Sequence, residues 1–149
     1  MKTIYLQALG IWLLFAVVAN INGIIRNLGY GPFMPELTAH QLSCLTGAVA
    51  FGTVMFLFFR LTKAEFSRMD LFLIGSMWLA MTICFEFLFG HYVIGHSWDR
   101  LLADYNLLKG RLWVLILLWT WLGPLIMGSL ASGDLSLLGA GANRVTEVS

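Results

Sequence analysis

The sequence predicts an all-α integral membrane protein whose four transmembrane helices form an antiparallel bundle. The first observation is composition: 59% of the 149 residues are hydrophobic and only 11% are charged, whereas soluble domains usually carry about 25% charged residues. A chain of this length also has too little interior to bury so much apolar surface within itself. The second observation is that apolar stretches long enough to cross a bilayer separate the charges, so we expect lipid around most of the chain.

Gaps between charged residues locate the spans. Three gaps lie between Lys2 and Arg26, between Glu36 and Arg60, and between Arg111 and Asp134. Each exceeds the roughly 20 helical residues that cross about 30 Å of hydrocarbon. The third span is less regular, because Glu86 lies near its far end. The predicted spans cover residues 4–24, 40–60, 69–90 and 110–131, and all are expected to be helical because a lone strand in lipid leaves backbone groups unpaired.

The sequence allows a prediction for each end of the chain, and the N-terminal helix has an alternative interpretation. We expect residues 1–132 to form one transmembrane domain and the polar, glycine-rich residues 133–149 to form a mobile tail. Lys2, followed by an apolar run to Ala19, is also compatible with a cleaved signal peptide. A retained first helix is favoured because it gives an even bundle.

Basic residues predict the orientation, because they are enriched in cytoplasmic loops. The turn between the second and third spans holds Arg60, Lys63 and Arg68. With Lys2 and Arg144, five basic residues lie on this side against four on the other. We therefore expect both termini to be cytoplasmic, in a cell (inner) membrane.

The two outer loops carry different signals. Residues 27–36 hold two glycines and two prolines, which predicts a structured, non-helical connection. In the second outer loop, Ser97 is a candidate helix cap with Asp99 in the first turn. The apolar residues that follow recur at helical spacing: Trp98, Leu101, Leu102 and Tyr105. This pattern predicts a short amphipathic helix in the interface, with an ordinary loop anchored by aromatic residues as the alternative.

Small residues mark the expected contacts between helices, because close approach is the source of packing energy in lipid. They recur at helical spacing in two spans: Ser43 with Gly47, Ala48 with Gly52, and Ser76 with Ala80 and Cys84. Gly123-Pro124 is expected to kink the last span. The tryptophans of that span, Trp113, Trp119 and Trp121, are expected to face lipid or the interface.

The topology brings four helix ends together on the outer side, and these ends hold most of the unusual polar residues. The candidate ligand-binding or ion-pair cluster comprises Glu86, Arg26, Arg111, Asn22, His91, His40 and Asp104. Glu86 is its centre, because a carboxylate about one turn inside the membrane costs several kcal/mol unless it is paired or protonated. Three roles stay open for Glu86: a structural clamp with Arg26 or Arg111, ligand binding or proton transfer, and a side chain that reaches out to water.

The sequence gives less support for a metal site, for cysteine chemistry or for nucleic-acid binding. The three histidines are His40, His91 and His96, and their spacing matches neither a helical ligand pair nor HExxH, so we predict no metal site. Cys44 and Cys84 are expected to be buried free thiols, with a disulfide or a nucleophile as alternatives. A net charge of +1 gives no basic patch for nucleic acid. The sequence does not indicate a cofactor.

Four segments are similar to a family of small four-span bacterial membrane proteins to which no function is attached. They are residues 39–43 (AHQLS), 85–92 (FEFLFGHY), 97–106 (SWDRLLADYN) and 110–113 (GRLW). The resemblance covers most of the chain but implies no activity. Length and span count are also similar to the MAPEG glutathione-dependent enzymes, but their charged signature on the second span is missing between His40 and Arg60.

The sequence favours a protein that binds or transports a small solute, an ion or a lipid headgroup through the outer polar cluster. Membrane lipids are the expected partners. Four short helices enclose little space, so a homo-oligomer or a larger membrane complex is also expected. The alternatives are an accessory subunit in which the cluster is a structural clamp, and a membrane enzyme with a lipid-like substrate.

Overall fold

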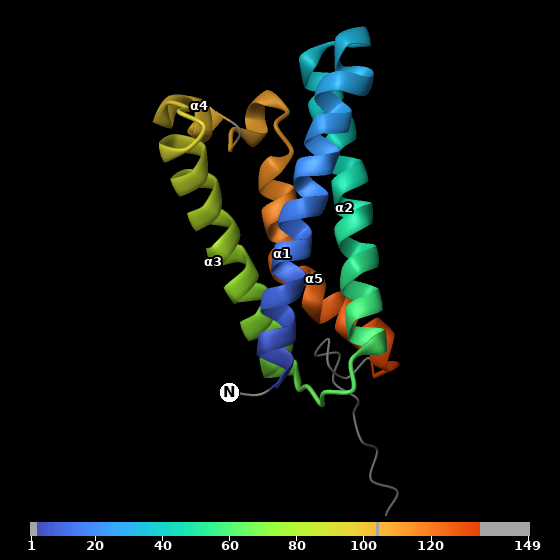
Figure 1. The fold of residues 1–149 in the computed structure, drawn as a ribbon. Helices are drawn as coiled ribbons and strands as arrows, with labels where there is room; N and C mark the ends of the chain where they lie inside the picture. Colours follow the sequence, from blue (N-terminus) through green and yellow to red (C-terminus); the bar gives the residue numbers. More distant parts are fainter. Residues whose placement is uncertain (1–2, 104, 135–149) are drawn as a thin grey trace, which may run out of the picture.

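The computed structural model describes residues 3–103 and 105–134, which form helices joined by short turns (Figure 1). The elements, in chain order, are α1 (Thr3–Ile24), the π-helix η1 (Ile25–Tyr30), the 3-10 helix η2 (Gly31–Phe33), α2 (Glu36–Leu61), α3 (Arg68–Tyr92), α4 (Trp98–Ala103), the 3-10 helix η3 (Leu107–Lys109) and α5 (Trp113–Ser132). The predicted tail lies mostly outside the described residues.

Four helical stretches in the described part of the chain are long and apolar enough to cross a membrane. They are Thr3–Phe33, Glu36–Leu61, Arg68–Tyr92 and Trp113–Ser132. The prediction of an all-α fold with four membrane-spanning helices is therefore confirmed. The first stretch extends nine residues beyond the predicted span, because η1 and η2 continue the helical path to Phe33.

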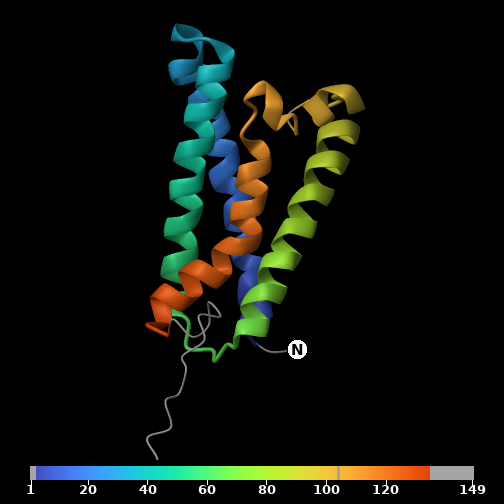
Figure 2. The same ribbon diagram turned by 180° about the vertical axis from the view of Figure 1, so that it is seen from behind.

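Successive long helices run in opposite directions (Figure 1). The end of α1, the start of α2, the end of α3 and the start of α5 consequently lie toward the same end of the molecule, which we call the α4 end. α5 packs against both α2 and α3, and α1 packs mainly against α2. α3 leans away from the other helices toward the α4 end (Figures 1 and 2), so the bundle is splayed there.

The non-helical connection predicted for residues 27–36 is wrong. Pro32 lies in the first turn of η2, where a helix tolerates a residue without an N–H, and Pro35 occupies the cap position of α2. Gly31 closes the π-helix by donating its backbone N–H to the carbonyl of Arg26. As a result, the α1–α2 hairpin projects beyond α4 (Figure 1).

The short helix predicted after Ser97 is confirmed as α4. The Ser97 hydroxyl accepts a hydrogen bond from the backbone N–H of Arg100 at 3.3 Å. Leu101 is buried against Gly90 of α3, which anchors α4 across the end of that helix. The helix ends at Ala103, however, so Tyr105 follows the helix instead of completing its apolar face.

The aromatic core lies where α1, α2 and α3 meet. Phe15 of α1 stacks on Phe51 of α2 with ring centroids 4.6 Å apart, and its edge contacts Trp78 of α3 at 4.8 Å. Trp78 is fully buried, and its indole N–H donates to the carbonyl of Ala8 at 2.8 Å. The only polar group of this large side chain is therefore paired, as burial requires.

α3 and α5 approach each other closely at Gly75. A Cβ at this position would overlap the backbone carbonyl of Trp121, so only glycine permits the observed approach. One turn before Gly75 on α3, Leu71 fills the space that Gly128 of α5 leaves. Pro124 lies inside α5, and the helix bends in this region (Figure 2), as Gly123-Pro124 predicted.

The tryptophans of α5 do not all have the lipid-facing environment predicted for them. Trp119 and Trp121 are half-buried, and their indole N–H groups donate to the Ala48 carbonyl at 3.0 Å and to the Ser76 hydroxyl at 3.1 Å. Ala48 and Ser76 belong to the small-residue stripes, which therefore bring helices of the same chain together. A buried indole needs a hydrogen-bond acceptor, and a neighbouring helix is its nearest source.

We predict that Gly75→Ala destabilises the protein, whereas Gly10→Ala does not. The new methyl group at position 75 has to displace α5, and overpacking of this kind costs about 1–3 kcal/mol. Gly10 is exposed on α1 and has no neighbour within 4 Å of an added Cβ. Thermal unfolding in detergent measures both variants, and equal midpoints would contradict the close contact.

Candidate binding site at the α4 end

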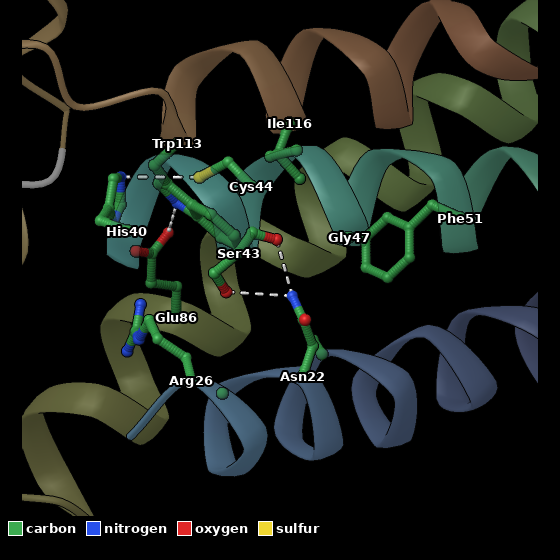
Figure 3. Close-up of a pocket in the computed structure, with 12 residues that line it drawn as sticks. Asn22, Arg26, His40, Ser43, Cys44, Gly47, Phe51, Glu86, Trp113 and Ile116 are labelled. Atoms are coloured by element: carbon green, nitrogen blue, oxygen red, sulfur yellow. Dashed lines mark hydrogen bonds between the residues drawn. The ribbon is translucent and has the colours of Figure 1, made fainter. Parts of the chain in front are cut away.

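A cavity of about 240 Å³ lies between the helices at the α4 end (Figure 3). We call it the central cavity. Its wall is built from all four spanning segments, by Ala19, Asn22, Gly23, Arg26, His40, Ser43, Cys44, Gly47, Phe51, Glu86, Trp113 and Ile116. Four of the seven predicted cluster residues line it: Asn22, Arg26, His40 and Glu86. The structure thus brings together more than half of the predicted cluster.

Glu86 contributes a half-buried carboxylate from α3. Its Oε2 atom accepts hydrogen bonds from the Tyr105 hydroxyl at 2.6 Å and from the Trp113 indole N–H at 2.8 Å. Tyr105 follows α4 and Trp113 begins α5, so one oxygen ties α3 to both segments. Hydrogen bonds of this kind to a carboxylate are stronger than those between neutral groups. They offset part of the cost of placing Glu86 inside a span.

Arg111 and Arg26 each contact another residue near the cavity. Arg111 forms an ion pair at 2.9 Å with Glu36, the first residue of α2. The Arg26 Nε atom donates to Asn27 at 3.1 Å, although Arg26 shares the central cavity with Glu86 (Figure 3). A clamp through Glu86 therefore stays a prediction. The pair with Glu36 was missed, although the antiparallel topology places the first turn of α2 near the start of α5.

Asn22 joins α1 to α2. Its amide nitrogen donates to the carbonyl and hydroxyl oxygens of Ser43 at 2.8 and 3.0 Å, and its amide oxygen accepts from Thr46 at 2.9 Å. Gly47 leaves room for this amide, because an added Cβ would lie 3.2 Å from the amide nitrogen. The side chain thus fixes the two helices that form one wall of the cavity.

His40 and Cys44 form a contact that was not predicted from the sequence. They lie one turn apart on α2, and the His40 Nε2 atom is 3.6 Å from the Cys44 sulfur. Both side chains are buried, with exposed fractions of 6% and 8%. The i, i+4 spacing was the available signal. Among the described residues neither cysteine forms a disulfide. Cys44 is buried as predicted, whereas Cys84 is exposed.

His91 lies apart from the other predicted cluster residues. Its Nδ1 atom is 2.9 Å from the His96 carbonyl oxygen, and its ring stacks on Trp98 at 3.9 Å. These contacts place it at the corner between α3 and α4, outside the wall of the central cavity. Asp104 lies outside the described residues. Within the described part of the chain, no group of three His, Cys, Asp or Glu side chains is arranged to hold a metal ion.

Two further cavities share walls with the central cavity. The first, of about 390 Å³, includes Arg26, Arg100, Arg111, His40 and Glu36, and we call it the cationic cavity. The second, also about 390 Å³, lies between α1 and α3, and we call it the apolar groove. Its wall includes Trp12, Phe15, Ile24, Phe85, Glu86 and Trp113. Arg26 and His40 also line the central cavity, as do Glu86 and Trp113, so the three spaces adjoin one another.

No protein-family model matches the chain, and neither a characterised protein nor a solved structure is significantly similar to it. The resemblance to small bacterial membrane proteins consequently stays a prediction, and function has to be argued from the cavities.

We predict that Asn22→Leu destabilises the protein by about 1–2 kcal/mol, because it removes three hydrogen bonds to α2 and such bonds are worth about 0.6 kcal/mol each on average. Asn20→Leu is the matched control, since the Asn20 amide donates to Ala16 of its own helix. Unfolding in detergent compares the two. Similar losses in both variants would show that the bonds to α2 add little.

Proposed function

We propose that the protein is an integral membrane protein that binds a lipid with an anionic headgroup at the α4 end. One observation carries the proposal: a cationic cavity and an apolar groove adjoin the same central cavity. A ligand that is anionic at one end and apolar at the other matches this arrangement. A small soluble anion would use only the cationic part.

The charges of the cationic cavity support a phosphate-bearing headgroup. Three arginines line this cavity, compared with one carboxylate, that of Glu36. A guanidinium group presents donors that match two oxygens of a phosphate at once. Arg111 is already engaged with Glu36, so Arg26 and Arg100 are the residues we assign to the headgroup.

The apolar groove supports a lipid chain. Trp12, Phe15 and Ile24 supply one wall from α1, and Phe85 supplies the other from α3. The groove lies between α1 and α3. The ribbon shows that α3 leans away from α1 toward the α4 end (Figure 1). A bound chain would therefore bury apolar surface of Ile24 and Phe85, which are otherwise exposed.

The accessory-subunit alternative accounts for less of the structure. The bonds of Asn22 and the pair of Glu36 with Arg111 are explained by a structural clamp. Of the three adjoining cavities, the cationic one is not, because helix packing alone gives no reason to line a space with three arginines. All of them lie within one chain, so binding does not require the oligomer that the sequence suggested.

We also propose that the α4 end faces the outside and that both termini are cytoplasmic, in the inner membrane of a bacterial cell. The basic turn at Arg60, Lys63 and Arg68 supports this orientation. The site would then be supplied with lipid from the outer leaflet.

For lipid binding, we predict that native mass spectrometry of the purified chain detects phosphatidylglycerol bound in preference to phosphatidylcholine. Arg26→Gln should weaken phosphatidylglycerol binding about tenfold, because a hydrogen bond to a charged group is worth about 1.5–3 kcal/mol. Arg60→Gln is the control, since Arg60 is exposed in the last turn of α2 at the opposite end. Equal binding of the two lipids, or an equal effect of both variants, would contradict the proposal.

For orientation, we predict that a cysteine at His96 reacts with a membrane-impermeant maleimide added to intact cells, whereas one at Lys63 reacts only after permeabilisation. Both substitutions are made in a Cys84→Ser background, because Cys84 is exposed and would otherwise react. The opposite labelling pattern would reverse the orientation but leave the lipid site unchanged.

A further inference from the structure

We propose that Cys44 and His40 are a nucleophile and its base, and that Cys44 accepts an acyl group from a lipid ester in the central cavity. The proposal goes beyond binding, because it assigns a covalent reaction. It rests on the proposed function only for the kind of acyl donor.

The geometry of the pair carries the proposal. The Cys44 sulfur and the His40 Nε2 atom are 3.6 Å apart, which is within hydrogen-bonding distance for sulfur. Both side chains are more than nine-tenths buried, yet both line the central cavity, and Figure 3 shows their contact at its wall. The thiol is thus shielded from bulk water but reachable by a ligand inside the cavity.

The surroundings of the pair suit acyl transfer. A thiol reacts as its thiolate, and an adjacent histidine that takes the proton is the usual means of activation. Arg26, which we assign to the headgroup, also lines this cavity, and its positive charge there favours the oxyanion that forms when a carbonyl is attacked. The apolar groove adjoins the cavity at Glu86 and Trp113, so an acyl chain in the groove would lead to the cavity that Cys44 lines.

The reaction balances without an oxidant or a metal. The thiol proton moves to His40 Nε2, and the sulfur attacks the ester carbonyl carbon. The carbon–oxygen bond to the alcohol then breaks, its electron pair stays on that oxygen, and His40 returns the proton there. The products are a thioester on Cys44 and a free alcohol, here a lysolipid. Water or another alcohol or amine releases the acyl group in a second step, with His40 again taking the proton.

Cys84 provides the matched control. It is the other cysteine of the chain, it lies exposed on α3, and it lines none of the three cavities. A reaction that depended only on thiol exposure would favour Cys84. A reaction that depends on the cavity and on His40 favours Cys44.

The test uses p-nitrophenyl laurate, because an oxygen ester of a phenol transfers its acyl group to a thiol far more favourably than a glycerol ester does. The purified full chain is incubated with the ester in mild detergent, and intact-mass spectrometry with peptide mapping locates the adduct. We expect one hydroxylamine-sensitive laurate on Cys44 in the wild type and in Cys84→Ser, and none in Cys44→Ser or Cys44→Ala. His40→Gln should slow the reaction about a hundredfold or more.

Thermal unfolding establishes that each variant is folded. Laurate on Cys84 instead of Cys44, or an unchanged rate in folded His40→Gln, would overturn the proposal. Retained phosphatidylglycerol binding without any Cys44 adduct would overturn acyl transfer alone. Acylation of Cys44 without phosphatidylglycerol binding would overturn the headgroup assignment alone.

Discussion

At Gly75 the backbone of α3 reaches the backbone of α5 beside Trp121, and α5 in turn packs against α2, the main neighbour of α1. Leu71 and Gly128 extend the close packing toward the end of the bundle that carries the termini. Toward the α4 end, α3 leans away from the other helices (Figure 2). Phe85 and Trp113 line the apolar groove there. The same tilt that closes one end of the bundle opens the cavities at the other.

Polar side chains stabilise the splayed end, because lipid offers them no hydrogen-bond partners. Glu86 joins α3 to Tyr105 and Trp113, while Asn22 joins α1 to α2. A role as a structural clamp and a role as a binding site are therefore compatible for the polar cluster. The bonds hold the walls in place, while Arg26, His40 and Cys44 line the enclosed space.

The spans were predictable because a helix that crosses lipid needs a minimum length and few charged residues, and both properties are visible in the sequence. The connection at residues 27–36 was not, because Pro32 and Pro35 fall at positions where helices accept proline, and their spacing alone does not reveal this. The tryptophans of α5 were misjudged for a related reason: a single sequence does not show which face of a uniformly apolar helix meets a neighbour.

The sequence by itself determined four apolar helices and the gathering of polar residues at one end, because both follow from the order of residues along an antiparallel chain. Only the tertiary structure decided that Asn22, Arg26, His40 and Glu86 share a cavity while His91 does not. Rotation and tilt of each helix select the residues that meet, and packing against neighbouring helices sets both. Here the close packing of α3 on α5 requires the glycine at position 75.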